Sequence, residues 1–127
     1  MRPANHCFVC GHDNPIGLKL VFQRVGEGVK TEFVPSDLHV GYDGVVHGGI
    51  ISALVDDALA NIWAAPGREA ITAKIEVRFR QQVRPGDNLV IEAQPTGMKA
   101  GMHTGRVDIR RGNELVADGS GLLVVRP

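Results

Sequence analysis

The chain has 127 residues, which is enough for one domain with a substantial core and too short for two. Fourteen basic and fourteen acidic side chains give zero formal net charge, so no overall field favours nucleic acid or an anionic membrane. The composition, 43% hydrophobic and 22% charged, excludes a disordered chain. No apolar run is long enough for a membrane span, and no signal-peptide pattern opens the chain. We therefore expect a single cytoplasmic domain over residues 1–127.

A polar, turn-rich segment over residues 1–17 comes first. It holds Cys7 and Cys10, whose spacing is more typical of a metal or redox pair than of a disulfide framework, together with His6 and His12. No second cysteine pair follows to complete a tetrahedral zinc site, and adjacent His6 and Cys7 are too close to bind one ion together. We expect a tight structural turn and no metal, although a ligand from a second subunit would favour a metal.

Alternating apolar and polar residues between turns predict strands over residues 18–25, 29–34, 71–80, 89–93, 104–110 and 115–125. The alternation is strictest over residues 71–80, where Ile71, Ile75 and Phe79 fall on one face and Thr72 falls on the other. The sixteen glycines fit a strand-rich fold with tight turns.

One helix stands between these strands. Apolar residues recur at helical spacing from Ile51 to Ile62, and Pro66-Gly67 ends the pattern. The helix is apolar on nearly every side, which is typical of a buried element, yet Asp56 and Asp57 lie in its middle. An ionised carboxylate is costly to bury without a partner or a task. This conflict marks the helix as the candidate site.

A single buried helix and a single antiparallel sheet of about five or six strands fit together only if the sheet wraps around the helix. The fold class predicted from the residues is therefore α+β, with one long central helix in a curved sheet.

The spacing of His47-Gly48-Gly49 and Asp56 resembles that of the hotdog-fold acyl-CoA thioesterases, especially the phenylacetyl-CoA type. The turn at residues 84–87 and the Cys7–Gly11 and Asn14–Leu18 segments are also similar to members of this group. The resemblance implies a hotdog fold and hydrolysis of an acyl- or aryl-CoA thioester. Coenzyme A is then part of the substrate, and no cofactor is expected.

The residues supply chemistry that suits this reaction. A backbone N–H of Gly48 or Gly49 at the start of the helix can stabilise the oxyanion that develops on a carbonyl oxygen. Asp56 can attack the thioester or take a proton from water, and the sequence leaves these two mechanisms open. Adjacent helix residues face about 100° apart, so we expect Asp57 to point away from the site as an ordinary polar residue.

A length argument predicts a homodimer. Eight helical residues rise about 12 Å, so Gly48 and Asp56 of one chain cannot both reach one carbonyl group. If both residues take part, they come from different subunits, with two composite sites at a two-fold interface. Known hotdog thioesterases are built in this way, and many also form tetramers, so a dimer and a dimer of dimers both remain open.

Other residues complete the candidate site. The resemblance matches Thr72 to a serine or threonine that orients the water or the carboxylate. His47 either donates a hydrogen bond near the carbonyl or holds the turn by bonding to the backbone. Arg78, Arg80 and Arg84 are candidates for the phosphates of coenzyme A, with a solvated strand face as the alternative.

Two other functions compete with hydrolysis. A protein of the same fold that binds acyl-CoA without catalysis is the main alternative. A hotdog hydratase is weaker, because such enzymes usually pair a histidine and a carboxylate in an arrangement for which no stretch matches.

Overall fold

The computed structural model describes residues 4–127, and residues 1–3 of the predicted N-terminal segment lie outside the described residues. The elements follow the order β1 (Gln23–Val25), β2 (Gly28–Phe33), a 3₁₀ turn η1 (Asp37–His39), α1 (Gly48–Trp63), β3 (Glu69–Phe79), β4 (Leu89–Lys99), β5 (Met102–Arg111) and β6 (Glu114–Arg126).

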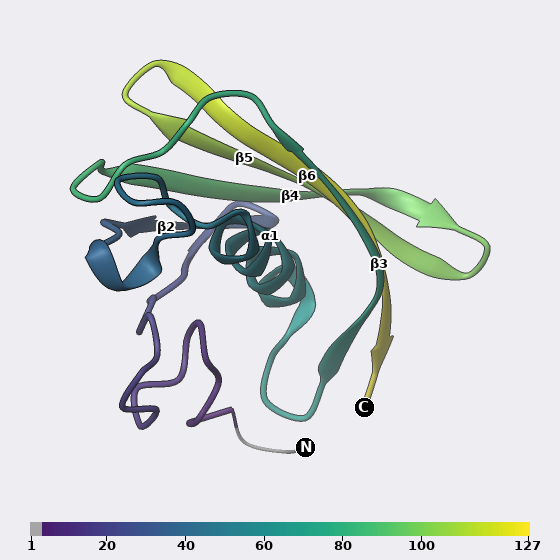
Figure 1. Ribbon diagram of the computed structural model, residues 1–127. Helices are drawn as coiled ribbons and strands as arrows, with labels where there is room; N and C mark the ends of the chain where they lie inside the picture. Colours follow the sequence, from purple (N-terminus) through teal and green to yellow (C-terminus); the bar gives the residue numbers. More distant parts are fainter. Residues whose placement is uncertain (1–3) are drawn as a thin grey trace.

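The strands form one antiparallel sheet in the order β1-β2-β4-β5-β6-β3. The sheet curves around α1, which lies in its concave side, while the N-terminal segment runs along the other side of the helix (Figure 1). The predicted α+β arrangement of one central helix in a curved sheet is confirmed. The short strand β1 forms one edge of the sheet and the long strand β3 forms the other.

The first predicted strand, over residues 18–25, was wrong over most of its length, because β1 begins only at Gln23. The backbone N–H groups of Leu18 and Leu20 donate to the carbonyls of Phe8 and Val9 instead. These bonds attach residues 18–20 to the N-terminal segment and keep them out of the sheet.

Helix α1 buries the face that its periodicity predicts. Leu54, Val55, Ala58 and Leu59 are fully shielded from solvent. The helix lies so close to β5 and β6 that glycines face it there: a Cβ atom on Gly105, Gly119 or Gly121 would meet helix side chains at 2.7–2.8 Å. These glycines set the close packing that holds α1 in the sheet.

Both ends of α1 are capped by side chains. At the N-terminus, His47 is the capping residue and its side chain accepts a hydrogen bond from the Gly49 N–H. At the C-terminus, Arg24 donates to the carbonyls of Ile62 and Asn61, and Arg68 donates to the carbonyl of Trp63. Cationic donors suit this end because its last carbonyls lack helical partners.

Strand β3 carries a bulge that the strict alternation of residues 71–80 did not predict. The register with β6 shifts between Thr72 and Lys74, which leaves Ala73 as the extra residue. Thr72 is then opposite Leu123, which is fully buried, and therefore lies on the helix side of the sheet. The prediction that Ile71 shares a face with Ile75 was wrong, because the bulge reverses the order of faces before Ala73.

Within residues 4–127, no helix is both long enough and apolar enough to cross a membrane. The expected cytoplasmic location stays a prediction.

Candidate functional site

The bulge in β3 joins Thr72 to the helix. The Thr72 hydroxyl donates to Oδ1 of Asp56 at 2.6 Å, and both residues are half-buried. Because a hydroxyl bond to a charged acceptor is strong and directional, this contact fixes the orientation of the carboxylate. Within residues 4–127, Oδ2 of Asp56 has no hydrogen-bond donor, so it is free to act on a substrate or a water molecule.

At the start of α1, the two glycine amides differ. The Gly49 N–H donates to Nδ1 of His47 at 2.7 Å and is therefore already satisfied. The Gly48 N–H finds no acceptor among the described residues. Because Nδ1 of His47 accepts, the proton of the neutral ring lies on Nε2, which points a donor away from the turn. Of these two glycines, Gly48 is therefore the one whose backbone N–H is free to bind a ligand.

A hollow of about 410 Å³ lies at Gly48. Its wall includes Phe79 from the end of β3, together with Arg80 and Val83 from the segment that follows. A Cβ atom on Gly48 would lie 3.4 Å from the Phe79 ring, so the ring lies directly over the helix start. A ligand group here would meet an aromatic surface, one free amide and one guanidinium.

The uninterrupted helix separates Gly48 from Asp56. Both belong to α1, which runs from Gly48 to Trp63 without a break. Eight residues along an α-helix rise about 12 Å, so one chain does not bring these two groups to one carbonyl carbon. The Asp56–Thr72 pair and the Gly48 amide are therefore two separate parts of the candidate site within one chain.

The three predicted arginines take different positions. Arg80 pairs with Asp118 at 2.7 Å, and Asp118 is almost fully buried. Arg78 is exposed and lies opposite Asp118 in the register of β3 and β6, on the outer face of the sheet. Arg84 begins the turn closed by Asp87, whose carboxylate accepts the Arg84 N–H. Of the three, Arg80 borders the hollow at Gly48.

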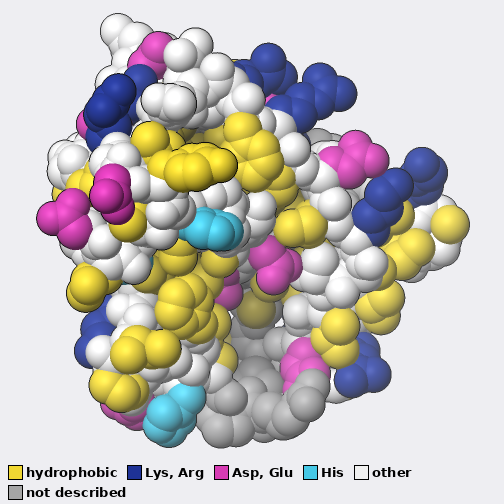
Figure 2. Space-filling view, in the orientation of Figure 1, with side chains coloured by type: hydrophobic (Ala, Val, Ile, Leu, Met, Phe, Trp, Pro, Cys, Tyr) yellow, Lys and Arg dark blue, Asp and Glu magenta, His cyan; other side chains and the backbone are white. Residues whose placement is uncertain are grey.

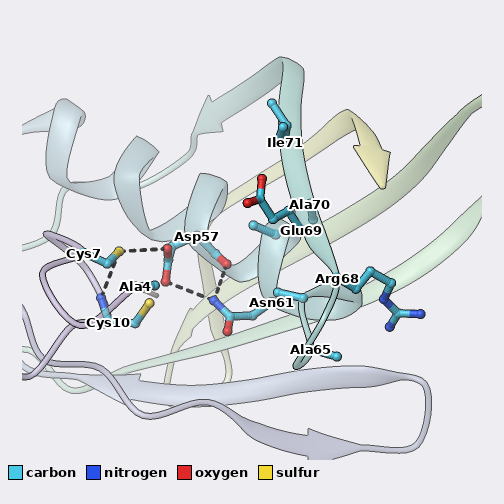
Figure 3. Close-up of a pocket in the computed structure, with 12 residues that line it drawn as sticks. Ala4, Cys7, Cys10, Asp57, Asn61, Ala65, Arg68, Glu69, Ala70 and Ile71 are labelled. Carbon is cyan, nitrogen blue, oxygen red and sulfur yellow. Dashed lines mark hydrogen bonds between the residues drawn. The ribbon is translucent and has the colours of Figure 1, made fainter. Parts of the chain in front are cut away.

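Asp57 points away from the Asp56–Thr72 pair, as expected, but it belongs to a partly buried cluster and is not an ordinary solvated polar residue. Its carboxylate accepts from the Cys7 thiol at 3.4 Å and from the Asn61 amide at 3.1 Å. The Cys10 sulfur lies in the same group, since the three ligand atoms of Cys7, Cys10 and Asp57 are within 4.8 Å of one another (Figure 3). The N-terminal segment therefore packs its two cysteines onto the second aspartate of α1.

Burial governs the electrostatics of this cluster. It raises the pKa of the Asp57 carboxyl above its ordinary value, against the hydrogen bonds from Cys10 and Cys7, which lower that pKa. Burial also raises the pKa of the Cys10 thiol, and the charge of nearby Asp57 raises it further. Asp57 and Cys10 therefore oppose one another's ionisation.

Residues 43–117, more than half of the chain, match the family profile of the thioesterase superfamily. The chain belongs to this superfamily. The matched range contains all of α1 and β3, and so includes both halves of the candidate site.

Among curated relatives of this superfamily member, a protein of Deinococcus radiodurans named "Putative esterase" is 35% identical over 71 residues, or 56% of this chain. A protein of Archaeoglobus fulgidus with the same name is 28% identical over 89 residues, or 69% of this chain. The matches span 48% and 58% of those two proteins, so the chain matches only about half of their length.

Solved structures of the superfamily share the fold. A crystal structure described as a thioesterase superfamily protein has a TM-score of 0.85 at 23% identity, covering 94% of this chain and 63% of that one. The Escherichia coli PaaI protein, from the phenylacetic acid degradation operon, has a TM-score of 0.77 at 18% identity, covering 87% of this chain and 81% of PaaI. The predicted resemblance to hotdog thioesterases is confirmed at the level of fold and superfamily.

Proposed function

We propose that the chain hydrolyses an acyl- or aryl-CoA thioester to a carboxylic acid and free coenzyme A. The observation that supports this most directly is the Thr72–Asp56 hydrogen bond of 2.6 Å, formed by a bulge inside the matched range. It orients a half-buried carboxylate and leaves the second carboxylate oxygen free. The free amide of Gly48 supplies the complementary donor.

The chemistry needs a base or nucleophile and an oxyanion donor. In one route, Asp56 takes a proton from water as the water oxygen bonds to the thioester carbon. In the other, Asp56 attacks that carbon itself and water then hydrolyses the resulting anhydride. In both, the Gly48 N–H stabilises charge on the carbonyl oxygen, the carbon–sulfur bond breaks, and the coenzyme A thiolate leaves and takes up a proton. Thr72 is a positioning residue, because it acts through Asp56.

A second copy of the chain is required to complete this site, since one chain separates Gly48 from Asp56. The helix face around Asp56 is suited to close approach, with the small, incompletely buried residues Gly49, Ser52, Ala53 and Ala60. In Figure 2, acidic side chains reach the surface over the region of α1 among hydrophobic ones. The outer edge of β3, eleven residues long, pairs with no strand of the described chain and offers backbone groups to a second copy.

Arg80 is the best placed of the basic residues to meet a phosphate of coenzyme A, because it borders the hollow at Gly48. A guanidinium presents paired donors to phosphate oxygens. Arg78 on the outer face and Arg84 in the turn remain candidates, and His47 contributes its outward Nε2–H. The apolar part of the substrate would lie against Phe79.

Hydrolysis is tested by release of free thiol from short, long and aromatic acyl-CoAs with purified protein. Asp56→Asn keeps the shape of the side chain and removes its charge, so turnover should fall at least about 1,000-fold on at least one substrate that the wild type hydrolyses. Glu92→Gln makes the same chemical change on the exposed part of β4 and should retain wild-type turnover.

Two results would contradict the proposal. Unchanged turnover in Asp56→Asn would remove Asp56 from its role. Tight binding of acyl-CoA that is recovered intact after long incubation with the wild type would instead support the non-catalytic alternative.

A further inference from the structure

A second site lies on the other side of α1, where the N-terminal segment meets the helix. Cys7 and Cys10 come from that segment, and Asp57 comes from the middle of α1 (Figure 3). They converge on the wall of a cavity of about 480 Å³, which Asn61, Ala64 and Ala70 also line. The proposed hydrolysis uses none of these side chains.

The turn that carries the cysteines is held by its own backbone. The Gly11 N–H donates to the Cys7 carbonyl at 2.9 Å, and the Cys10 N–H points at the Cys7 sulfur at 3.5 Å. A Cβ atom on Gly11 would lie 2.3 Å from the Cys7 nitrogen, so the tight turn requires glycine. Both sulfurs are therefore presented from one preformed turn.

The spacing of the three groups suits a tetrahedral ion. Zinc bonds of about 2.3 Å to sulfur and about 2.1 Å to oxygen place two tetrahedral ligands about 3.6 Å apart. The Cys7 sulfur and Oδ1 of Asp57 are 3.4 Å apart, and all three ligand atoms lie within 4.8 Å of one another. The Cys10 sulfur lies within the same 4.8 Å limit of the other two ligand atoms.

No positively charged side chain of the described residues donates to Asp57 in this cluster. The side chains that donate to Asp57 within residues 4–127 are thiols and an amide, and none carries a positive charge. Arg68 lines the same cavity, but its guanidinium donates to the Trp63 carbonyl and points away from Asp57 in Figure 3. Where the described residues supply no cation, three acidic groups placed together are stable as anions only around a metal ion.

We propose that Cys7, Cys10 and Asp57 bind a zinc ion. Two thiolates and one carboxylate form a donor set that suits Zn²⁺, and the cavity leaves the fourth position open to water. On binding, the ion loses water ligands and both thiol protons pass to solvent. The ion ties the N-terminal segment to α1. This inference differs from the expectation of no metal and does not depend on the proposed hydrolysis.

Metal analysis of the reduced, tag-free chain tests the site. The protein is incubated with zinc, desalted and measured for zinc per chain, and the same protein is loaded with Co²⁺ for absorption spectroscopy. We expect about one zinc per chain, together with the intense visible and near-ultraviolet bands of tetrahedral cobalt bound to thiolate.

Variants assign the ligands. Cys10→Ser and Asp57→Asn should each weaken zinc binding at least about 100-fold, more than loss of an outer hydrogen-bond partner does. Asp56→Asn is the matched control on the neighbouring helix position and should keep the zinc. Circular dichroism checks that each variant is folded.

Three results would overturn the proposal. The first is a reduced wild-type chain that retains less than about a tenth of an equivalent of zinc after this loading. The second is a zinc content that is unchanged in both folded ligand variants. The third is a Cys7–Cys10 disulfide that persists under reductant and excludes zinc. The first and third come from the wild-type chain and do not depend on how a variant folds.

Discussion

Asp56 and Asp57 are consecutive residues of one helix, and their carboxylates face different elements. Asp56 meets the Thr72 hydroxyl on β3, whereas Asp57 meets Cys7 and Asn61 on the side of the N-terminal segment. The step of about 100° between helix neighbours is enough to separate them. Two identical side chains on one helix therefore acquire different chemical properties, because different elements pack against the two faces of the helix.

The two carboxylates also differ in how many of their oxygen atoms already accept hydrogen bonds. Asp56 accepts one strong hydrogen bond and keeps one oxygen free, which suits a base or a nucleophile. Asp57 uses both oxygens within its cluster, and burial raises its pKa. These differences support the proposals that Asp56 takes part in the reaction and that Asp57 binds the metal.

Apart from the loss already expected for Asp56→Asn, the largest effect on turnover is expected from removing the oxyanion donor. Gly48→Pro removes the backbone N–H at the first helical position, where proline is tolerated. His47 already has the extended backbone that precedes a proline, at φ −62° and ψ 135°. Turnover should fall about 100- to 1,000-fold, as for other lost oxyanion donors. Gly48→Ala keeps the amide and should lose far less.

The same variant tests whether the site is shared between subunits. Refolding Gly48→Pro with Asp56→Asn in equal amounts gives mixed dimers in which one site has both native groups. Activity should recover to about one quarter of wild type, since half of randomly assorted dimers are mixed and each has one intact site. No recovery in dimers shown by mass spectrometry to be mixed would place both groups in one chain.

A smaller effect on turnover is expected from changing Thr72, the residue that positions Asp56. Thr72→Val removes the hydroxyl that holds Asp56 and keeps the shape of the side chain. Loss of a hydrogen bond to a charged group costs about 1.5–3 kcal/mol, so kcat should fall about 10- to 100-fold with little change in KM. Thr72→Ser keeps the hydroxyl and should recover most of the rate. A KM effect without a kcat effect would instead make Thr72 a substrate contact.

Periodicity was sufficient to predict the central architecture. The spacing of Leu54, Val55 and Ala58 predicted the buried face of α1. Alternation predicted a sheet of about five or six strands, which the presence of a single buried helix required to be curved, and the sheet has six strands. These features depend on local hydrophobic order, which a sequence carries directly. The contact of Thr72 with Asp56 was expected from the family resemblance, but its cause was not. The bulge at Ala73 depends on register with β6, a long-range property.

The second cluster could not be derived in the same way. Cys7 and Asp57 are fifty positions apart, and nothing local in the sequence states that their segments meet. Two signals did exist: a pair of cysteines at metal spacing and an acidic residue left over in an apolar helix. To connect these two signals, one has to know that residues 18–20 form hydrogen bonds with the N-terminal segment, which lies against α1.

A third aspartate, Asp87, lies outside both clusters. Its replacement is expected to have the smallest effect, and that effect is on the stability of the fold. Asp87 accepts from the Arg84 N–H and from Arg111 at 2.7 Å, and these bonds hold the pKa of its carboxyl below its ordinary value. Its contribution to stability is therefore present above the unfolded pKa of about 3.9 and is lost as pH falls through the lower folded value.

Asp87→Asn should lower the free energy of unfolding by about 0.5–1 kcal/mol at pH 7, because the pair is partly open to solvent. The difference between wild type and variant should shrink below about pH 4 in urea titrations, as the wild-type carboxyl becomes protonated. Arg111→Gln removes the same ion pair from the other side together with the contacts of Arg111 to Glu114 and Gln82, so it should cost at least as much stability as Asp87→Asn. A difference that stays constant down to about pH 2 would assign the effect to the side-chain hydrogen bond to the Arg84 amide rather than to the charge.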